Sequence, residues 1–149
     1  MKIIDTFVFY NELDMLNLRL HELNDVVDYF ILVEANKTFT DNIKEYIFEK
    51  NKEKYDKFLH KIIHIKVDDM PENTGNKDNW NREWHQRNQI KRGLDQLNLN
   101  HEDIIILSDV DEIPKVDTIT NIKNSKINTI YKLEMDFYYY NFQNKVEGF

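Results

Sequence analysis

The amino-acid sequence predicts an α/β fold: a mostly parallel sheet flanked by helices, in a Rossmann-like arrangement. Short β-branched and aromatic stretches alternate with stretches in which apolar residues recur at helical spacing. Several apolar stretches lead into carboxylate or amide side chains, as strands do when they end at a ligand site of a parallel sheet. The 149 residues suffice for one core, so residues 1–149 are predicted to form a single domain.

The first half of the chain alternates predicted strands and helices. Three stretches rich in β-branched and aromatic residues are predicted strands: 3–10, 26–34 and 61–69. Between the first two, leucines at helical spacing form one apolar stripe: Leu13, Leu16, Leu20 and Leu23. A charged amphipathic stretch, 43–59, predicts a second helix.

The second half continues this alternation after a turn-rich stretch, 70–79. Residues 80–97 predict a helix, 103–109 a strand and 115–124 a short helical segment. A last strand is predicted over 129–142 because apolar and polar residues alternate within it. The alternation gives an apolar and a polar face: Tyr131, Leu133, Met135 and Phe137 against Lys132, Glu134, Asp136 and Tyr138.

Polar side chains stand at the ends of the first four predicted strands. Right-handed crossovers would place them along one carboxyl edge of the sheet: Asn11, Glu34, Asp68, Asp69 and Asp109. Ligands of open α/β sheets bind at that edge. We therefore expect the functional residues there.

Composition excludes several classes of function. A net charge of −7, with basic residues scattered along the chain, predicts no nucleic-acid partner. The absence of cysteine excludes disulfides, thiolate metal sites and a cysteine nucleophile. No apolar leader and no 18-residue apolar span occur, which predicts no membrane segment in this chain and a cytoplasmic location.

The stretch "DIIILSDVDEIP" (103–114) carries the clearest chemical signal. Asp109 and Asp111 leave a buried strand at a spacing of two, so a small bend lets both carboxylates face one point. Paired carboxylates without cysteine or clustered histidine favour a hard cation, Mn²⁺ or Mg²⁺. Such ions are usually held by one or two carboxylates together with substrate phosphates. The pattern predicts a cation that holds a diphosphate.

Two other interpretations of these carboxylates stay open. Asp111 or Glu112 can cap the helix that follows. The local pattern is also close to that of haloacid-dehalogenase-type phosphatases, in which the first aspartate is a phosphorylated nucleophile. Those enzymes need a downstream lysine and a further acidic pair, and only 38 residues follow Asp111. Their motif also normally follows the first strand.

The predicted helix 80–97 offers basic and aromatic side chains. Arg87, with Asn88, can contact a phosphate or orient the metal-binding carboxylates if their face lies toward the strand ends. The alternative is a solvated basic face. We interpret Trp80 and Trp84 as packing residues rather than a sugar-stacking platform.

Taken together, five stretches resemble glycosyltransferase family 17, the family of the β-1,4-mannosyl-glycoprotein 4-β-N-acetylglucosaminyltransferases. They occur in the family's order and cover nearly the whole chain: "DTFVFYNELDMLNLRLHELNDVVDYFILVEANKTFT" (5–40), "KIIHIKVDDMP" (61–71), "REWHQRNQIKRGL" (82–94), "DIIILSDVDEIPK" (103–115) and "YYYNF" (138–142).

The resemblance implies a GT-A-like fold and an inverting transfer of N-acetylglucosamine from UDP-N-acetylglucosamine to a carbohydrate or glycoconjugate acceptor. It implies that Asp109 and Asp111 bind Mn²⁺, or Mg²⁺, and that Asp109 also contacts the UDP-sugar. By analogy with GT-A enzymes, Asn11, Glu12 and Glu34 would lie near the nucleoside of the donor. Arg87 and Asn88 would lie near its diphosphate.

The chain also departs from the family. Animal members carry a membrane anchor and continue into an acceptor-side portion, so we expect this domain to be incomplete at its C-terminal side. Glu134 and Asp136, on the polar face of the last predicted strand, are the candidates for the catalytic base; the alternative is a solvated face. A non-catalytic module that binds a nucleotide-sugar is the rival interpretation of the whole chain.

Overall fold

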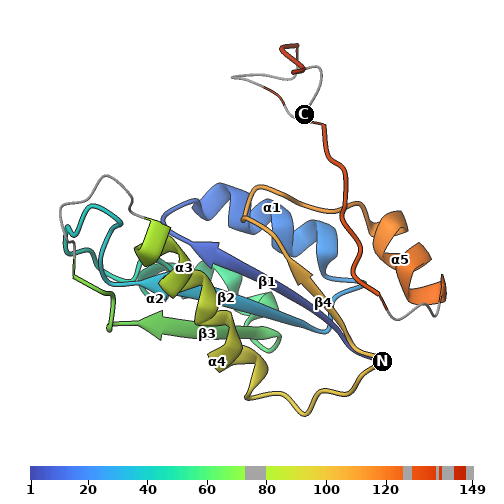
Figure 1. The fold of residues 1–149 in the computed structure, drawn as a ribbon, viewed down its shortest axis with the longest axis horizontal. Coiled ribbons are helices and arrows are strands. Elements are labelled where there is room, and N and C mark those ends of the chain that lie inside the picture. Colours follow the sequence, from blue (N-terminus) through green and yellow to red (C-terminus); the bar gives the residue numbers. More distant parts are fainter. Residues whose placement is uncertain (73–79, 126–128, 137, 139–142, 147–149) are drawn as a thin grey trace.

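A computed structural model of the chain confirms the α/β prediction (Figure 1). It describes residues 1–72, 80–125, 129–136, 138 and 143–146. Within these residues, four parallel strands form one sheet in the order β3-β2-β1-β4. Their bounds are β1 Ile3–Phe9, β2 Tyr29–Ala35, β3 Ile62–Val67 and β4 Ile104–Leu107.

Helices cover both faces of the sheet, so the fold has three layers (Figure 1). One face is packed by α1 (Leu13–Leu23), α2 (Ile47–Asn51), the 3₁₀ helix η1 (Lys52–Phe58) and α5 (Val116–Ser125). The other face is packed by α3 (Trp80–Asn88) and α4 (Ile90–Leu94).

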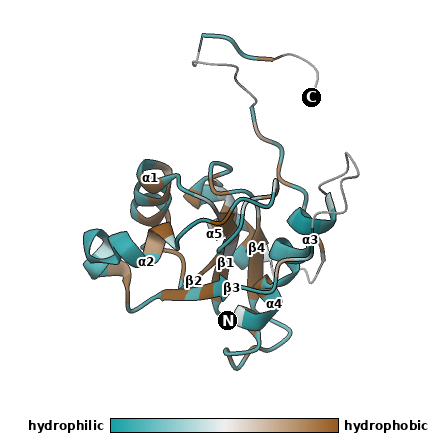
Figure 2. Ribbon diagram, turned by 90° about the vertical axis from the view of Figure 1, so that its left-hand side faces the viewer, coloured by the Kyte–Doolittle hydropathy of each residue, from teal (hydrophilic) through white to brown (hydrophobic). Residues whose placement is uncertain are grey.

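The two faces of the central strands are both apolar, as expected for a parallel sheet covered on both sides. Phe7 and Phe30 point into the cluster beneath α1, and Ile4 and Ile31 point into the cluster beneath α4. In Figure 2 the strands are accordingly coloured as hydrophobic between helices with hydrophilic outer surfaces. A Cβ on Gly93 of α4 would lie 2.5 Å from Ile31, so this glycine permits the close approach of helix and sheet.

Two predicted helices are interrupted. The prediction over 43–59 is corrected to α2 and η1, because α2 starts only at Ile47 and Tyr55 has non-helical dihedral angles. The prediction over 80–97 is corrected to α3 and α4, which are separated by Gln89. There Arg92 donates its N–H to the carbonyl of Gln89 at 2.9 Å, an i→i+3 bond that tightens the turn.

The second strand begins three residues later than predicted from 26–34. The amides of Val26 and Val27 both donate to the carbonyl of Leu23, so these valines continue the turn that ends α1. The bounds of the remaining elements that were predicted before residue 126 agree within two residues.

The predicted last strand, 129–142, is wrong for the residues that the structure describes. No strand occurs over 129–136, and Tyr138 makes one isolated antiparallel bridge with Lys145. Residues 137 and 139–142, including Phe137, lie outside the described part. On the predicted apolar face, Tyr131 is 39% exposed and Met135 is 48% exposed, so this face is not covered by the described part of the chain.

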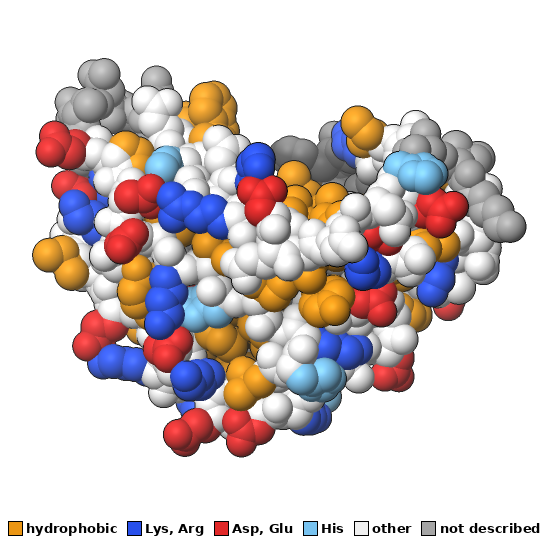
Figure 3. Space-filling view, turned by 90° about the horizontal axis from the view of Figure 1, so that it is seen from below, with side chains coloured by type: hydrophobic (Ala, Val, Ile, Leu, Met, Phe, Trp, Pro, Cys, Tyr) orange, Lys and Arg blue, Asp and Glu red, His pale blue; other side chains and the backbone are white. Residues whose placement is uncertain are grey.

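The described surface mixes charges of both signs. Figure 3 shows lysine and arginine side chains interspersed with aspartate and glutamate over one face of the molecule. Surface ion pairs include Lys91 with Asp95 and Lys66 with Glu49. Among the described residues, no helix has the length and apolar character that crossing a membrane requires.

Candidate functional site

Helix α3 meets the carboxyl ends of the strands and fixes the geometry of this edge. Gln86, 5% exposed, donates from Nε2 to the carbonyl of Val33 at 3.1 Å and to that of Phe9 at 3.5 Å. One side chain thereby ties α3 to the ends of β1 and β2. Arg87, the next residue, reaches the loop that follows β4.

Arg87 is the positive partner of Asp109. Its Nη2 donates to Asp109 Oδ1 at 2.8 Å and to Glu83 Oε1 at 3.2 Å. The Arg87 side chain is 30% exposed and that of Asp109 is 49% exposed, so solvent reaches the pair. The structure thus brings together two residues that the sequence predicted to act at the same site.

The loop after β4, residues 108–112, carries Asp109 and Asp111 and is called the D-x-D loop here; its side chains divide into buried and exposed ones. Val110 is 6% exposed and belongs to the core cluster beneath α1, whereas Asp111 is exposed. The loop is closed by two contacts: the Asp109 amide donates to Glu112 Oε2 at 2.9 Å, and the Glu112 amide donates to the Asp109 carbonyl at 3.0 Å. Asp111 has no side-chain hydrogen bond or ion pair within the described residues.

The helix-capping interpretation finds no support in these contacts. Helix α5 begins at Val116, beyond Pro114, and Glu112 accepts from the amide of Asp109 rather than from α5. Within the described residues, neither Asp111 nor Glu112 accepts a hydrogen bond from an amide of α5.

The donor set of this loop suits a hard cation only in combination with a ligand. No group of three or more histidine, aspartate or glutamate side chains in the described part of the chain is arranged to hold a metal ion. Asp109 and Asp111 supply carboxylate oxygens, and Mg²⁺-type ions are commonly held by one or two carboxylates plus substrate phosphates. The residues present therefore fit Mn²⁺ or Mg²⁺ bound together with a diphosphate.

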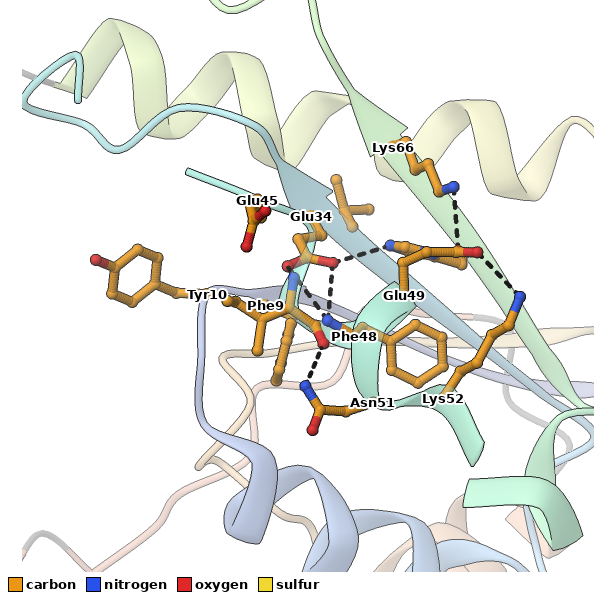
Figure 4. Close-up of polar contacts among 12 residues, drawn as sticks. Phe9, Tyr10, Glu34, Glu45, Phe48, Glu49, Asn51, Lys52 and Lys66 are labelled. Carbon is orange, nitrogen blue, oxygen red and sulfur yellow. Dashed lines mark hydrogen bonds and ion pairs between the residues drawn. The ribbon is translucent and has the colours of Figure 1, made fainter. Parts of the chain in front are cut away.

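Glu34, predicted to lie near the nucleoside, is fully buried and engaged by the protein (Figure 4). Its carboxylate accepts from the amides of Ile47 and Phe48, the latter at 3.2 Å, and so caps the start of α2. Lys44 Nζ and His64 Nε2 each lie 3.1 Å from its oxygens. These contacts give Glu34 a structural role, and its contact with the nucleoside stays a prediction.

The other predicted donor contacts lie at the end of β1 and on α3. Glu12 Oε2 accepts from the amides of Tyr10 and Asn11, both at 3.0 Å, and closes the connection from β1 to α1. Asn11 and Asn88 are exposed. Asn11 and Glu12 follow β1, and Asn88 is the last residue of α3; their contact with the donor stays a prediction.

The candidate bases are not held at this edge by any described contact. Glu134 and Asp136 are exposed, and no hydrogen bond or ion pair joins either to Asp109 or Asp111 in the described ranges. Asp136 instead pairs with Lys145 at 2.6 Å, and this hydrogen bond lowers the pKa of the Asp136 carboxyl below its usual value.

Three arginines organise the carboxyl edge through contacts that the sequence analysis did not predict. Arg92 donates to Asp69 at 2.6 Å, which ties the end of β3 to α4 and lowers the pKa of Asp69. Arg82, 2% exposed, donates to the carbonyl of Thr38 at 2.9 Å in the loop after β2. Arg19 is also fully buried and contacts the D-x-D loop. Arg19 carried a signal in the sequence, because it falls within the leucine stripe of α1.

The tryptophans of α3 do not pack as predicted. Trp80 is 56% exposed and Trp84 is 58% exposed. They lie on the helix that also supplies Arg87, so α3 carries exposed aromatic surface.

A cavity of about 360 Å³ lies at the opposite, amino edge of the sheet. It is lined by Ile3, Val27, Lys61 and Asn124, among others. Lys61 Nζ there donates to the carbonyls of Asn24 and Val27 at 2.6 and 2.9 Å, a structural use of its charge. We place the candidate site at the carboxyl edge, where the acidic and basic side chains converge.

Comparison with known proteins gives one family. The family model of glycosyltransferase family 17 matches residues 1–148. The chain is 30% identical over 126 residues to the β-1,4-mannosyl-glycoprotein 4-β-N-acetylglucosaminyltransferases of Rattus norvegicus and Homo sapiens, and 29% identical to that of Mus musculus. Each alignment covers 82% of this chain, but the chain spans only 23–24% of the length of these relatives. No solved structure matches the chain.

Proposed function

The chain belongs to glycosyltransferase family 17, and from this membership we propose that it binds a UDP-sugar and transfers the sugar to a carbohydrate acceptor. The observation that carries the proposal is the D-x-D loop at the carboxyl edge. Asp109 lies there beside Arg87, Asp111 is exposed two residues further along, and Val110 anchors the loop in the core.

Asp109 and Asp111 would hold Mn²⁺ or Mg²⁺ in this proposal. When bound there, the cation would act as a Lewis acid and would offset the negative charge of the UDP diphosphate. Arg87 orients the Asp109 carboxylate and stands close enough to that loop to donate to a phosphate oxygen as well. Asn11, Glu12 and Asn88 contribute polar groups along the same edge.

The donor and acceptor are inferred from the relatives. Their names describe transfer of N-acetylglucosamine to a mannosyl glycoprotein. We infer UDP-N-acetylglucosamine as donor, a glycan or glycoconjugate as acceptor, and inversion by a single in-line displacement. The exposed Trp80 and Trp84 support a saccharide ligand, since aromatic rings offer apolar surface with a polar edge.

Of the two base candidates, Glu134 suits the role better than Asp136. A general base works best when its pKa lies near the working pH. Because Lys145 lowers the pKa of Asp136, this carboxylate is a weaker base than an ordinary aspartate. Glu134→Gln should therefore leave donor affinity unchanged and reduce turnover if it takes the acceptor proton.

The decisive test is a thermal-unfolding shift with UDP-N-acetylglucosamine, with and without Mn²⁺. Ligand at 100-fold over its dissociation constant stabilises the folded state by about 2.7 kcal/mol. We expect a Mn²⁺-dependent shift in the wild type that is lost in Asp111→Asn. The matched control is Asp117→Asn, an exposed aspartate in the first turn of α5, which should keep the shift.

Three outcomes separate the hypotheses. A Mn²⁺-dependent shift together with release of UDP in the presence of a mannose-containing glycan supports the transferase. Binding without transfer to any glycan supports the non-catalytic module. No shift with any UDP-sugar, or an equal shift in Asp111→Asn, contradicts the donor site at the D-x-D loop.

A further inference from the structure

Arg19 is the most extensively engaged buried cation of the carboxyl edge. It lies in α1 between Leu16 and Leu20, on the face that packs against the sheet, and has no exposed surface. Its Nε and Nη2 donate to the two oxygens of Asp5 in β1, each at 2.7 Å. The guanidinium also lies over the ring of Phe7, 4.7 Å from its centroid.

The remaining donors of Arg19 all reach the D-x-D loop. Nη1 lies 2.7 Å from the carbonyl oxygen of Asp109 and 3.1 Å from the carbonyl oxygens of Val110 and Glu112. Nη2 donates to Ser108 Oγ at 2.7 Å. A guanidinium has five N–H groups in a rigid fork, and here all are directed either at Asp5 or at residues 108–112.

A buried ion pair is a costly way to stabilise a core. Burial raises the pKa of Asp5, and the hydrogen bonds and charge of Arg19 oppose that rise. Apolar side chains of similar volume often replace such pairs without loss of stability. What apolar side chains cannot do is donate to three loop carbonyls at once, so the contacts with the loop are the distinctive property of this pair.

The loop contacts determine which way the loop presents its side chains. With the carbonyls of Asp109, Val110 and Glu112 turned inward to Arg19, the peptide planes of the loop are fixed. The buried Val110 side chain fixes them from a second direction. Asp111 is left exposed on the outer side, and Asp109 is left within reach of Arg87.

We propose that the buried Asp5–Arg19 pair is a positioning device, which holds the backbone of residues 108–112 so that Asp109 and Asp111 are presented to a divalent cation and a diphosphate. This inference rests on the proposed function. Asp5 supplies the counter-charge and the orientation of the guanidinium, and Arg19 supplies the contacts with the loop. Neither residue touches the ligand.

The test replaces the pair by apolar side chains, in the double variant Asp5→Leu with Arg19→Met. Its first readout needs no ligand: hydrogen exchange of the Glu112 amide, which donates to the Asp109 carbonyl. Without Arg19 this turn opens more often, so exchange should become about tenfold faster or more. The control amides are those of β2, which should change only as much as global stability does.

The second readout is the dissociation constant of UDP-N-acetylglucosamine in the presence of Mn²⁺. A loop that must be ordered on binding should weaken affinity by about tenfold or more, even if the midpoint of thermal unfolding is unchanged. The control variant is Lys61→Met, which also removes a cation that donates to two loop carbonyls, but at the opposite edge. It should bind the donor as the wild type does.

The outcomes separate this inference from the proposed function. If the double variant exchanges and binds like the wild type, the positioning role is wrong while the donor site stands. If the wild type itself shows no Mn²⁺-dependent binding, the donor site is wrong, and exchange of the Glu112 amide still decides whether Arg19 holds the loop. Should the double variant not fold, Arg19→Lys keeps the charge beside Asp5 but lacks the fork, and it should change both readouts in the same direction.

Discussion

Glu34 and the D-x-D aspartates share one sequence pattern but have different environments in the structure. In both cases a carboxylate stands at the end of an apolar strand, at the same edge of one sheet. Glu34 has no exposed surface, and its oxygens are engaged by two amides, Lys44 and His64. Asp109 is half exposed, and Asp111 has no side-chain partner among the described residues.

The difference shows how to distinguish a carboxylate that the protein itself engages from one that is left available to a ligand. A buried carboxylate must find donors within the protein, because leaving it unpaired in the core is costly. Glu34 meets that requirement and leaves little capacity for a ligand. The carboxylate of Asp111 stays available to a ligand, because water can satisfy its hydrogen-bonding groups until a cation binds. Counting partners therefore separates the two roles where the pattern of strand and carboxylate does not.

The largest expected effect is on stability, at Glu34. Glu34→Ala removes the cap of α2 and leaves Lys44 without its buried partner, and breaking a buried pair in this way typically costs about 3–5 kcal/mol. Urea denaturation should show a lower midpoint with an unchanged slope. Glu34→Gln keeps the shape and one acceptor oxygen and should lose less.

The matched variant at the other carboxylate is Asp111→Ala. Because this side chain is exposed and has no partner among the described residues, stability should stay within about 0.5 kcal/mol of the wild type. The comparison breaks if Glu34→Ala is as stable as Asp111→Ala, or if Glu34→Ala alone abolishes binding of UDP-N-acetylglucosamine without loss of stability. The second result would give Glu34 the nucleoside contact that the sequence analysis predicted.

We expect an intermediate effect from replacing Arg87, because this side chain pairs with Asp109 and Glu83 but is still partly exposed to a ligand. The pair with Asp109 is 30% and 49% exposed, so Arg87→Met should lower stability by less than about 1 kcal/mol. Affinity for UDP-N-acetylglucosamine should fall about tenfold or more, since hydrogen bonds to charged groups are worth about 1.5–3 kcal/mol. Calorimetric titration with Mn²⁺ present measures the change.

Lys91→Met is the control for Arg87→Met, because Lys91 lies four residues further along and pairs with Asp95 at the surface. It should leave affinity unchanged. An equal loss of affinity in both variants would mean that only the net positive charge of this region matters, and that Arg87 has no specific contact with the donor.

The sequence alone predicted those features of the fold and the site that depend on contacts between residues close together in the chain. The strands and the convergence of polar residues at one edge followed from patterns within short stretches. The start of α2 did not, because its cap is Glu34, which lies 13 residues before Ile47 in the chain. Alternation over 129–142 describes the two faces of a strand but not whether a neighbour exists to pair with it, and that prediction was wrong for the described residues.

The sequence analysis did not identify Arg19, although the sequence contained a signal for its burial. It falls in the same buried stripe as Leu16, Leu20 and Leu23, while Asp5 interrupts an otherwise apolar strand. Opposite charges at two core-facing positions imply a buried pair, since neither can be buried alone. Which loop the rest of the guanidinium would contact depends on the order of strands, with β4 beside β1, and no local pattern contains that information.

The smallest expected effect concerns Asp69, a third carboxylate of the same edge and intermediate between the other two. Arg92 lowers the pKa of Asp69, so its carboxylate favours the folded state above the ordinary value of 3.8, and that contribution is lost as pH falls through the lowered pKa. In Arg92→Gln the pKa of Asp69 should return toward 3.8, as followed by carboxyl chemical shifts in an NMR titration. Because both side chains are nearly half exposed, stability at neutral pH should hardly change. A pKa of Asp69 that is unaffected by Arg92→Gln would mean that this ion pair does not persist in solution, and that α4 is held to the sheet by the packing of Ile90 and Leu94 alone.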